Sequence, residues 1–550
     1  MKKIGKLIKT TVECGGAYVR PPNNLSSNSN MSGSLSTKDK YFPCGENCFL
    51  TIESPDKAYV TFDLGGTKKL SYMYIWNFAM QPFYQNAGMR KVKIETSLDG
   101  INYQELKGKV YPYILAKARE DCLASNLDDG KNSPIDFDGL QAAYVKITPI
   151  GGAGEGNHGI YVEDISAYGL GKVRIYEAAE EVGKNEFRAV PAHEWSAEFS
   201  NMDGWGGADG IFCVPLDGKE TRGDTKKTLV LFSDTFVGKC NPETKVRQSM
   251  NMLNNTFGYL TNNGYDKRNI KFVVGKDKRG QEVSLITPQE GSEYYYWLQD
   301  AVTLGDFVYA FTDNVISFPE GPPGFKFDVI GVDIIKIPIV KGKAALDKYT
   351  IIKTNLHTKK GFFGCCVYPN TVSSGMPNPD GYVYVYGLGK KEVGQTLLLS
   401  RVKEEDFEDS SKYVFWDGKN WSNNIDDAIP ISQDGGSECS ITPVTYGKYK
   451  DKYMYTHMQN GIDRVVAVSF ADSLTGPFDK DIPIYSADDD YDLMSGGDCK
   501  GVYLYNAKAH YHISPKDELL ISYNINTSCY QSNMNNCDIY RPRFIRLKGV

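Results

Sequence analysis

Between residues 195 and 550 the sequence repeats one pattern five times, and this repeat limits the fold more than any other feature. Each repeat holds a first strand, a hydrophobic second strand that ends in a polar residue or glycine, and a third strand. The first strands open at Asp209, Asp300, Cys365, Glu438 and His510. Successive small sheets without a helical crossover pattern predict an all-β domain, a five-bladed β-propeller.

Two aspartates mark the strand ends of the first repeat. The strand GIFCVPL follows Asp209, and the strand TLVLFSD ends at Asp234. In an antiparallel pair the start of one strand lies beside the end of the next, so both carboxylates should emerge at one edge. Since the first strands of a propeller line its axis, residues at their starts should meet at one end of the channel. The two predicted rings are Asp209, Asp300, Glu438 and His510, and then Asp234, Asp313, His457 and Asn524.

The N-terminal segment has a different pattern. Five strand-like runs alternate apolar and polar residues between turn residues, which is typical of a β-sandwich. They span residues 58–64, 71–78, 90–97, 143–150 and 172–178. We therefore expect a β-sandwich over residues 1–176, a charged linker over residues 177–194 and the propeller over residues 195–550.

This segment resembles the discoidin, or coagulation factor 5/8 type C, module through VTFDLGG, YIWNF, GMRKVKIETSLDGINYQEL and GLGKVRIYE. The resemblance covers most of residues 17–178 and implies an eight-stranded jelly roll whose loops often bind glycans. Trp76 lies within a strand and should belong to the core. Six loop aromatics could stack on sugar rings, or could instead cap the sandwich: Tyr41, Phe42, Phe83, Tyr84, Tyr111 and Tyr113.

The composition limits the possible partners. The 62 basic and 68 acidic residues are interspersed and give a net charge of -6, which argues against nucleic acid or an anionic membrane and favours a neutral, polar ligand. No apolar run approaches the roughly 18 residues that a membrane span needs. The start, MKKIGKLIKTTVECGG, lacks the apolar core of an intact signal peptide. Either an export signal has been removed or the protein is not exported by that route.

The twelve cysteines are too sparse to require a disulfide framework. Two pairs could form in an oxidising compartment: Cys44 with Cys48, and Cys529 with Cys537. Cys365 and Cys366 should be buried. No cysteine pair has zinc-like spacing, so no set of metal ligands is predicted. The acidic run SADDDYD (486–492) could bind a structural Ca²⁺, although a solvated loop is the preferred interpretation.

The repeats also carry a family resemblance, through WGGADGIF, LFSDTFVG, NNTFGYL, SECSITPV, the GPF of residues 476–478, NAKAHYHISPKDELLISYNIN and YRPRF. These phrases resemble the bacterial uncharacterised families 4185 and 5005, of which some members are endo-acting arabinan hydrolases of glycoside hydrolase family 183. More distantly, the architecture is similar to glycoside hydrolase families 43 and 62. Those are five-bladed propellers with an aspartate base, a second aspartate that tunes pKa values and a glutamate acid.

The resemblance implies a role for each carboxylate. Asp209 matches the general base, Asp300 the pKa-tuning aspartate and Glu438 the general acid, while Asp234 is a rival for base or nucleophile. The residues support this chemistry independently, because cleavage of a glycosidic bond needs one protonated carboxylic acid and one carboxylate. Each residue also has a structural alternative: Asp209 could form an Asp-Gly turn, and Asp234 could cap the turn that follows it.

Further residues of the predicted funnel could bind substrate, although each could equally serve packing. Stacking on sugar rings is expected of Trp205, Tyr295, Trp297 and Tyr523, and hydrogen bonding to hydroxyls of Asn254, Asn255, Asn526 and Arg541. His510 could be a ligand of water or Ca²⁺ on the channel axis, by analogy with family 43, or a hydrogen-bonded core histidine.

Together these features predict a bacterial, extracellular or cell-surface glycoside hydrolase that acts as a monomer and needs no cofactor. Its partner would be a polysaccharide, with arabinan-like polymers as candidates, and the discoidin-like module would hold it on the substrate. The main alternative is a non-catalytic glycan-binding or adhesion protein, and a propeller enzyme of another class, such as a lyase, is a third. Retaining or inverting outcome and endo or exo action stay open.

Overall fold

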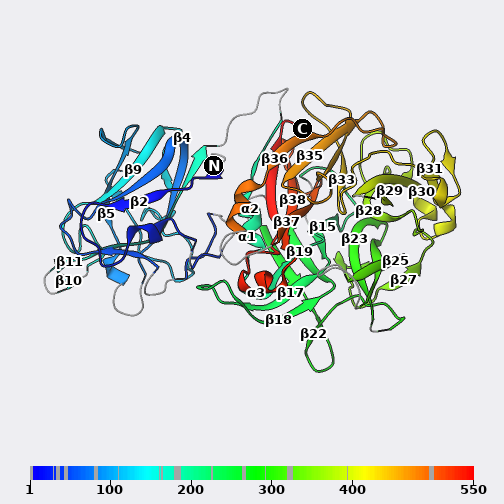
Figure 1. The fold of residues 1–550 in the computed structure, drawn as a ribbon, viewed down its shortest axis with the longest axis horizontal. Coiled ribbons are helices and arrows are strands. Elements are labelled where there is room, and N and C mark those ends of the chain that lie inside the picture. Colours follow the sequence, from blue (N-terminus) through cyan, green and yellow to red (C-terminus); the bar gives the residue numbers. More distant parts are fainter. Residues whose placement is uncertain are drawn as a thin grey trace. The chain divides into compact units, whose positions relative to one another are not determined.

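The structure is a computed structural model that describes residues 4–28, 30–32, 37–42, 47–79, 85–108, 111–159, 161–162, 165–178, 187–223, 227–262, 268–291, 293–318, 326–392, 394–494 and 501–550. Strands dominate these ranges, which confirms the all-β class, and their α-helices are α1 (His193–Glu198), α2 (Asp488–Met494) and α3 (Tyr530–Asn535) (Figure 1). No helix in the described ranges is long and apolar enough to cross a membrane. The chain divides into two compact units, residues 1–181 with 241–245, and residues 182–240 with 246–550.

The N-terminal unit is organised by β4 (Val60–Asn77), a strand of 18 residues. Its first part pairs with β2 and β9, and its last part with β12 and β8. Gly65 and Gly66, with φ of 68° and 120°, let the strand change direction between these partners. The other strands are β1 (Ile4–Leu7), β2 (Thr11–Cys14), β3 (Phe49–Thr51), β5 (Lys91–Ser97), β6 (Gln104–Glu105), β7 (Tyr113–Ile114), β8 (Ile135–Asp136), β9 (Gln141–Pro149), β10 (Tyr161–Val162), β11 (Ile165–Ser166) and β12 (Tyr168–Ala178).

The aromatic residues of this unit divide into packed and exposed ones. Trp76 is buried in the core, as expected. Tyr41 and Tyr113 are also buried, and their hydroxyls bond to the backbone of the unit, so both cap the fold and cannot stack on a sugar in this conformation. Tyr111 is exposed and Phe42 is half-buried. Three predictions fall outside the described residues: Phe83 and Tyr84 as sugar contacts, and Cys44 as a partner of Cys48. Residues 179–186 of the predicted linker also lie outside them.

The C-terminal unit contains five antiparallel sheets that follow one another along the chain. The first sheet contains β15 (Phe212–Pro215), β16 (Lys227–Phe232), β19 (Thr256–Asn262) and β20 (Arg268–Val273), and the second contains β23 (Tyr294–Leu304), β24 (Phe307–Ser317), β25 (Phe327–Val340), β26 (Lys343–Ala344) and β27 (Thr350–Lys353). The third sheet contains β28 (Gly361–Asn370), β29 (Tyr382–Lys390), β30 (Gln395–Lys403), β31 (Val414–Trp416) and β32 (Trp421–Ser422). The fourth contains β33 (Ser440–Pro443), β34 (Tyr453–Met458), β35 (Val465–Ala471) and β36 (Ile482–Ser486). The fifth is β37 (Val502–Ala509), β38 (Glu518–Thr527), β39 (Arg543–Lys548) and β13 (Arg188–Pro191).

The first strands of these sheets contact one another in order, from β15 to β23, β28, β33 and β37. The fifth sheet closes the unit, because its outer strand β13 comes from before the first sheet. β13 pairs with β39 from Arg188 opposite Lys548 to Pro191 opposite Ile545. The two ends of the C-terminal unit are therefore held in a single sheet.

The chain segments that form the first sheet also form a separate, three-stranded sheet next to it. β14 (Asp203–Ala208) leads into β15, β16 leads into β17 (Thr235–Cys240), and β18 (Arg247–Leu253) leads into β19. Asp209 and Asp234 lie at the bend between the two sheets, where the Asp209 amide bonds to the Asp234 carbonyl at 3.2 Å and the Ser233 amide to the Asp209 carbonyl at 3.0 Å. A two-stranded hairpin, β21 (Gly275–Lys276) and β22 (Glu282–Val283), follows the first sheet.

Three of the first strands are interrupted by β-bulges. In β23, Gln299 and Asp300 face the single residue between the paired positions Ala310 and Thr312. The register also shifts at Gly364 and Cys365 in β28, and at Asn506 and Ala507 in β37. A bulge turns the side chains next to it away from the strict two-residue alternation. The bulges therefore change the direction of the side chains beside them, which include Asp300 and Asn506.

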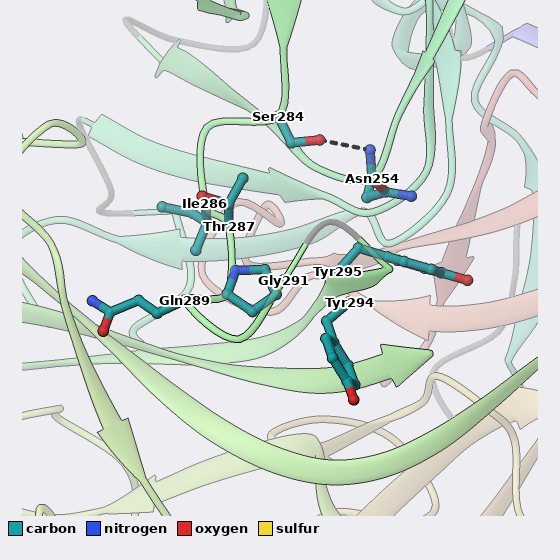
Figure 2. Close-up of a pocket in the computed structure, with 9 residues that line it drawn as sticks. Asn254, Ser284, Ile286, Thr287, Gln289, Gly291, Tyr294 and Tyr295 are labelled. Atoms are coloured by element: carbon teal, nitrogen blue, oxygen red, sulfur yellow. Dashed lines mark hydrogen bonds between the residues drawn. The ribbon is translucent and has the colours of Figure 1, made fainter. Parts of the chain in front are cut away.

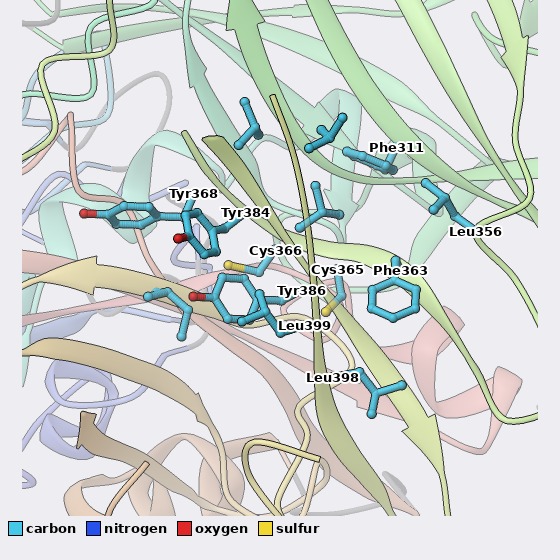
Figure 3. Packing of buried hydrophobic residues seen from close by; sticks show 14 of the residues in the cluster. Phe311, Leu356, Phe363, Cys365, Cys366, Tyr368, Tyr384, Tyr386, Leu398 and Leu399 are labelled. Atoms are coloured by element: carbon cyan, nitrogen blue, oxygen red, sulfur yellow. The ribbon is translucent and has the colours of Figure 1, made fainter. Parts of the chain in front are cut away.

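The largest core cluster lies around β28 and β29, where Cys365 and Cys366 pack with Phe363, Tyr386 and Leu399 (Figure 3). Both cysteines are buried, as predicted. Cys529 stands at the N-cap of α3 and Cys537 is buried, and their pairing stays a prediction.

The acidic run 486–492 is not the solvated loop that the sequence suggested, because it forms most of α2. Asp490 is buried there, accepting the Tyr523 hydroxyl, and the Nε of Arg543 lies 3.4 Å away. These contacts replace solvent and compensate for the burial of the charge. This aspartate anchors α2 to the fifth sheet, while Ca²⁺ binding by the run stays a prediction.

Closure by β13 can be tested by comparing residues 182–550 with residues 193–550. The shorter chain loses β13, with its four register pairs to β39 and the buried Ala189 and Val190. At about 1 kcal/mol for each of about four backbone hydrogen bonds, we expect its free energy of unfolding to be lower by about 2–4 kcal/mol. Denaturant unfolding measures the difference, and equal stabilities would show that β13 does not close the unit.

Candidate active site

The candidate site forms where the first strands meet, and a buried ion pair lies at its base. Lys508 of β37 donates to Oε2 of Glu438, the residue two before β33. Asn506 Nδ2 donates to Oε1 of the same carboxylate at 2.7 Å. The side chains of Lys508 and Glu438 are only 3% and 7% exposed, and the ammonium lies 4.6 Å from the centroid of the Phe212 ring. Both carboxylate oxygens of Glu438 are thus occupied inside the protein.

Burial raises the pKa of Glu438 to about 7, and the charge of Asp209 acts in the same direction. The Lys508 ammonium and the Gly210 backbone N–H act against this, because each stabilises the carboxylate. Removing either partner of such a pair would leave an uncompensated buried charge. The pair therefore behaves as one structural unit.

Asp209 lies between two tyrosines. Its Oδ2 accepts the Tyr505 hydroxyl at 2.8 Å and the Tyr540 hydroxyl at 2.9 Å, whereas the buried Oδ1 has no hydrogen-bond partner among the described residues. Burial raises the pKa of Asp209, but both hydroxyls and the Lys508 ammonium favour the carboxylate. This residue combines a stabilised charge with one unused oxygen.

Asp234 has a different environment. Its Oδ1 accepts Trp297 Nε1 at 2.8 Å and Asn254 Nδ2 at 3.2 Å. Burial and the nearby charge of Asp209 raise the pKa of Asp234 to about 7, against the weaker effect of the two donors. Near neutral pH a large fraction of Asp234 therefore carries a proton.

Two further aspartates approach the site from β23 and β24. Asp300 accepts the backbone amides of Ala301 at 2.9 Å and Val367 at 2.6 Å, and burial raises its pKa to about 7. Asp313 is buried and accepts Gln299 Nε2 at 2.8 Å. Burial, with the charge of Glu438, raises the pKa of Asp313 to about 7. The electrostatic effects of Lys508 on Asp209, Asp300 and Glu438 show that the predicted carboxylates share one region.

Four of the predicted binding residues border this region. Asn254 and Trp297 bond to Asp234 directly. Tyr295 is half-buried, with its ring centroid 5.8 Å from that of Trp297. Asn526 lies beside Tyr505, with Nδ2 at 3.4 Å from the Tyr505 hydroxyl.

Five other predicted binding residues are buried in structural contacts, so their side chains cannot reach a sugar in this conformation. Trp205 stacks on Phe272 at 4.2 Å, and Asn255 bonds to the carbonyls of Ile286 and Tyr296. His510 shares a hydrogen bond with Ser522, Tyr523 donates to Asp490, and Arg541 bonds to Gly206 and Asp538. Other parts of the protein cover both faces of the first and second strands. A polar or aromatic residue on these strands therefore packs inside the protein as often as it is free to bind a ligand.

The residues of the second predicted ring also differ in their surroundings. Asn524 is buried and donates to the Ala208 carbonyl at 3.0 Å. His457 is buried beside Asp481, at 3.2 Å, and Asp434, at 3.8 Å. These three residues offer ligand atoms within 4.8 Å of one another and could hold a metal ion. Protein groups contact both ring nitrogens of His457: Nε2 lies 3.2 Å from Asp481, and Nδ1 lies 3.2 Å from the Met458 carbonyl.

The sequence analysis did not identify Lys508, Asn506, Tyr505 and Tyr540. Lys508 lies on β37 (Val502–Ala509), so the first strand of the fifth sheet ends before His510, whereas the sequence predicted that it opens there. The side-chain directions of Tyr505 and Asn506 depend on the bulge in β37. The position of Tyr540, which has φ of 69°, depends on a turn after α3.

Comparison with known proteins gives two domain matches. Residues 193–550 match the family described as a domain of unknown function, DUF5005, and residues 26–163 match the F5/8 type C domain, which confirms the resemblance of the N-terminal segment. No curated protein matches the chain significantly.

Two solved structures are similar to parts of the chain. A protein of Bacteroides ovatus described as a "putative hydrolase" is 18% identical, over 67% of this chain and 93% of that chain, with a TM-score of 0.52. CBM32-1 from a family 31 glycoside hydrolase of Clostridium perfringens is 15% identical, over 32% of this chain and 96% of that chain, with a TM-score of 0.20. The first likeness concerns the fold alone.

The buried ion pair should show strong coupling in a double-mutant cycle. We expect Lys508→Met to lower the free energy of unfolding by about 3–5 kcal/mol, because it leaves Glu438 as an unpaired buried charge. Lys508→Met combined with Glu438→Gln should recover much of this loss, since no buried charge remains. Denaturant unfolding of the single and double variants measures the coupling, and additive losses would contradict it.

Asp313 provides a test of the raised pKa values. Its pKa is about 7 in the folded protein, against 3.8 for an unperturbed aspartate, so the folded state keeps a proton that the unfolded chain loses. The free energy of unfolding should therefore fall as pH rises from about 4 to 7 and then level off. Asp313→Asn should reduce that fall by about 1–3 kcal/mol. The exposed Asp347→Asn is the matched control, and equal pH profiles for the two variants would refute the assignment.

Proposed function

This chain belongs to the DUF5005 family, and from the chemistry of its site we propose that it is a glycoside hydrolase acting on a polysaccharide. The fold-level likeness to the Bacteroides ovatus protein described as a hydrolase supports a hydrolytic reaction. The F5/8 type C match supports a carbohydrate partner. Arabinan-like polymers are the first substrates to test, because the sequence resembles families that contain arabinan hydrolases.

The observation that carries the proposal is the contrast between Asp209 and Asp234. The two residues lie side by side at the bend of the first sheet. Burial raises the pKa of both residues, but two tyrosine hydroxyls and the Lys508 ammonium favour the carboxylate of Asp209, whereas Asp234 has only two neutral donors and its pKa is raised to about 7. Neighbouring carboxyl groups whose environments separate their protonation states are the requirement for acid–base cleavage of a glycosidic bond.

We assign the general acid to Asp234 and the base or nucleophile to Asp209. The Asp234 carboxylic acid would give its proton to the leaving glycosidic oxygen as the C–O bond breaks. Asp209 would take a proton from the attacking water, or would bond to the anomeric carbon and be released by water in a second step. In the first route Asp209 then releases its proton to solvent and Asp234 regains one from solvent; in the second, the Asp234 carboxylate takes its proton from the water that releases the sugar from Asp209.

Glu438 is less suited to the acid role that the family resemblance implied. A general acid needs a free proton within reach of the leaving oxygen, but both oxygens of Glu438 bond to protein groups and one of those groups is an ammonium. We propose that Glu438 positions Lys508, whose charge keeps Asp209 ionised. Asp300 is held by two backbone amides, and its charge would shift the pKa values of the other carboxyl groups in the same region.

We also infer that the five sheets are the blades of a propeller, because their first strands contact in order and β13 closes the last sheet. The protein would work outside the cell or on its surface, with the F5/8 type C unit holding it on the polymer and raising the local concentration of cleavable bonds.

Release of reducing ends from a panel of neutral polysaccharides, with arabinan first, tests the proposed function. Activity should disappear in the Asp209→Asn/Asp234→Asn double variant. If the purified protein binds a glycan of the panel but releases nothing over long incubation, the non-catalytic binding protein is the correct alternative.

The two roles can be separated by the leaving group. Asp234→Asn should lower kcat on polysaccharide by about 10²–10⁴-fold, because the leaving alkoxide receives no proton, but should affect activated aryl glycosides much less. Asp209→Asn should impair both substrates, with partial recovery by azide if Asp209 is a nucleophile. Rate measurements on the two substrates decide, and a leaving-group-dependent loss in Glu438→Gln instead would return the acid role to Glu438.

A further inference from the structure

A pocket of about 410 Å³ opens beside the proposed acid. Figure 2 shows Asn254 and Ser284 on one side of it and Tyr294 and Tyr295 on the other. Ser284 Oγ accepts the Asn254 backbone amide at 2.9 Å, which fixes the turn between β18 and β19 against the segment before β23. The volume lies in the range of sites for small molecules.

Asn254 links the pocket to the proposed active site. This residue lines the pocket, and its Nδ2 lies 3.2 Å from Asp234 Oδ1. Tyr295 lines the pocket as well and lies close enough to Asp234 that the aspartate charge, together with burial, raises the tyrosine pKa. A molecule in the pocket would therefore lie next to the bond that Asp234 protonates.

The walls have the chemistry of a site for a neutral sugar. None of the nine described residues that line the pocket carries a charge. Asn254 and Gln289 offer amides, Thr287 offers a hydroxyl, and Tyr295 offers an aromatic ring, which are the groups that hydrogen-bond and stack on sugars. A sugar carboxylate there would meet no cation among these residues and would lie near the Asp234 carboxyl group. An acidic sugar would thus bind at an electrostatic cost.

Building on the proposed function, we propose that this pocket is a subsite for a neutral sugar residue adjacent to the cleaved bond. The enzyme then acts on neutral polysaccharides and discriminates against polymers of uronic acids.

A bulky substitution at the exposed Thr287 tests the subsite without touching Asp234. We expect Thr287→Trp to fill the pocket and lower kcat/KM on neutral pentasaccharides of arabinose, xylose or glucose by about 10–100-fold. Lys278→Trp adds the same bulk at an exposed position of the hairpin between β21 and β22, outside the pocket, and should leave kcat/KM unchanged. Gln289→Arg adds a cation to the wall and should improve binding of pentagalacturonate.

The outcomes separate this proposal from the proposed function. If the wild type cleaves neutral pentasaccharides and Thr287→Trp acts like Lys278→Trp, the subsite is overturned and the hydrolase stands. If the wild type cleaves nothing, calorimetric titration of the same pentasaccharides decides. If the wild type binds these pentasaccharides and Thr287→Trp does not, the subsite is supported and the hydrolase proposal is refuted. If the wild type does not bind them, the subsite is refuted. Preference of the wild type for pentagalacturonate would also overturn it.

Discussion

The buried contact between Lys508 and Glu438 is the constraint on which the rest of the site depends. It joins the first strand of the fifth sheet to the start of the fourth, and it places one positive charge within reach of Asp209 and Asp300. Without this ammonium, several buried carboxyl groups would repel one another and would all favour protonation. With it, and with the larger effects of the Tyr505 and Tyr540 hydroxyls, the carboxylate of Asp209 is favoured, while Asp234 has only neutral donors. The hydroxyls and the cation together separate the environments of two adjacent aspartates.

The backbone that holds these groups is irregular where function is expected. Asp300 belongs to the bulge of β23, and Asn506, with φ of 59°, belongs to the bulge of β37 that precedes Lys508. A regular strand would send alternate residues to opposite faces, and the neighbours of each sheet would bury both sets. The bulges break that alternation and change the direction of the polar side chains beside them, at the expense of ladder hydrogen bonds.

Much of the fold could be predicted from the sequence, because alternation and turn residues mark each strand and recur with the repeats. The positions of Asp209, Asp234 and Glu438 followed from where strands begin and end, whereas Asp300 lies inside β23 and does not open it as had been predicted. The contacts of their neighbours did not follow from the strand ends. Trp205 and Tyr523 stand beside predicted site residues in the sequence, yet both are buried in packing, since strands covered on two sides give no polar face to read. Lys508 was missed because a two-residue bulge, which no sequence pattern announces, determines where its strand meets Glu438.

The position of Asp234 explains why the site and the neighbouring pocket should work together. The bend of the first sheet separates β16 from β17, so the strand end that carries Asp234 faces the turn at Asn254 on one side and Asp209 on the other. A sugar that displaces water from the pocket would reduce the solvation of Asp234 further, and loss of solvation favours its protonated form. Substrate binding would then raise the pKa of the acid at the moment when its proton is needed. Asp209, whose charge is held by tyrosine hydroxyls and an ammonium inside the protein, would change much less.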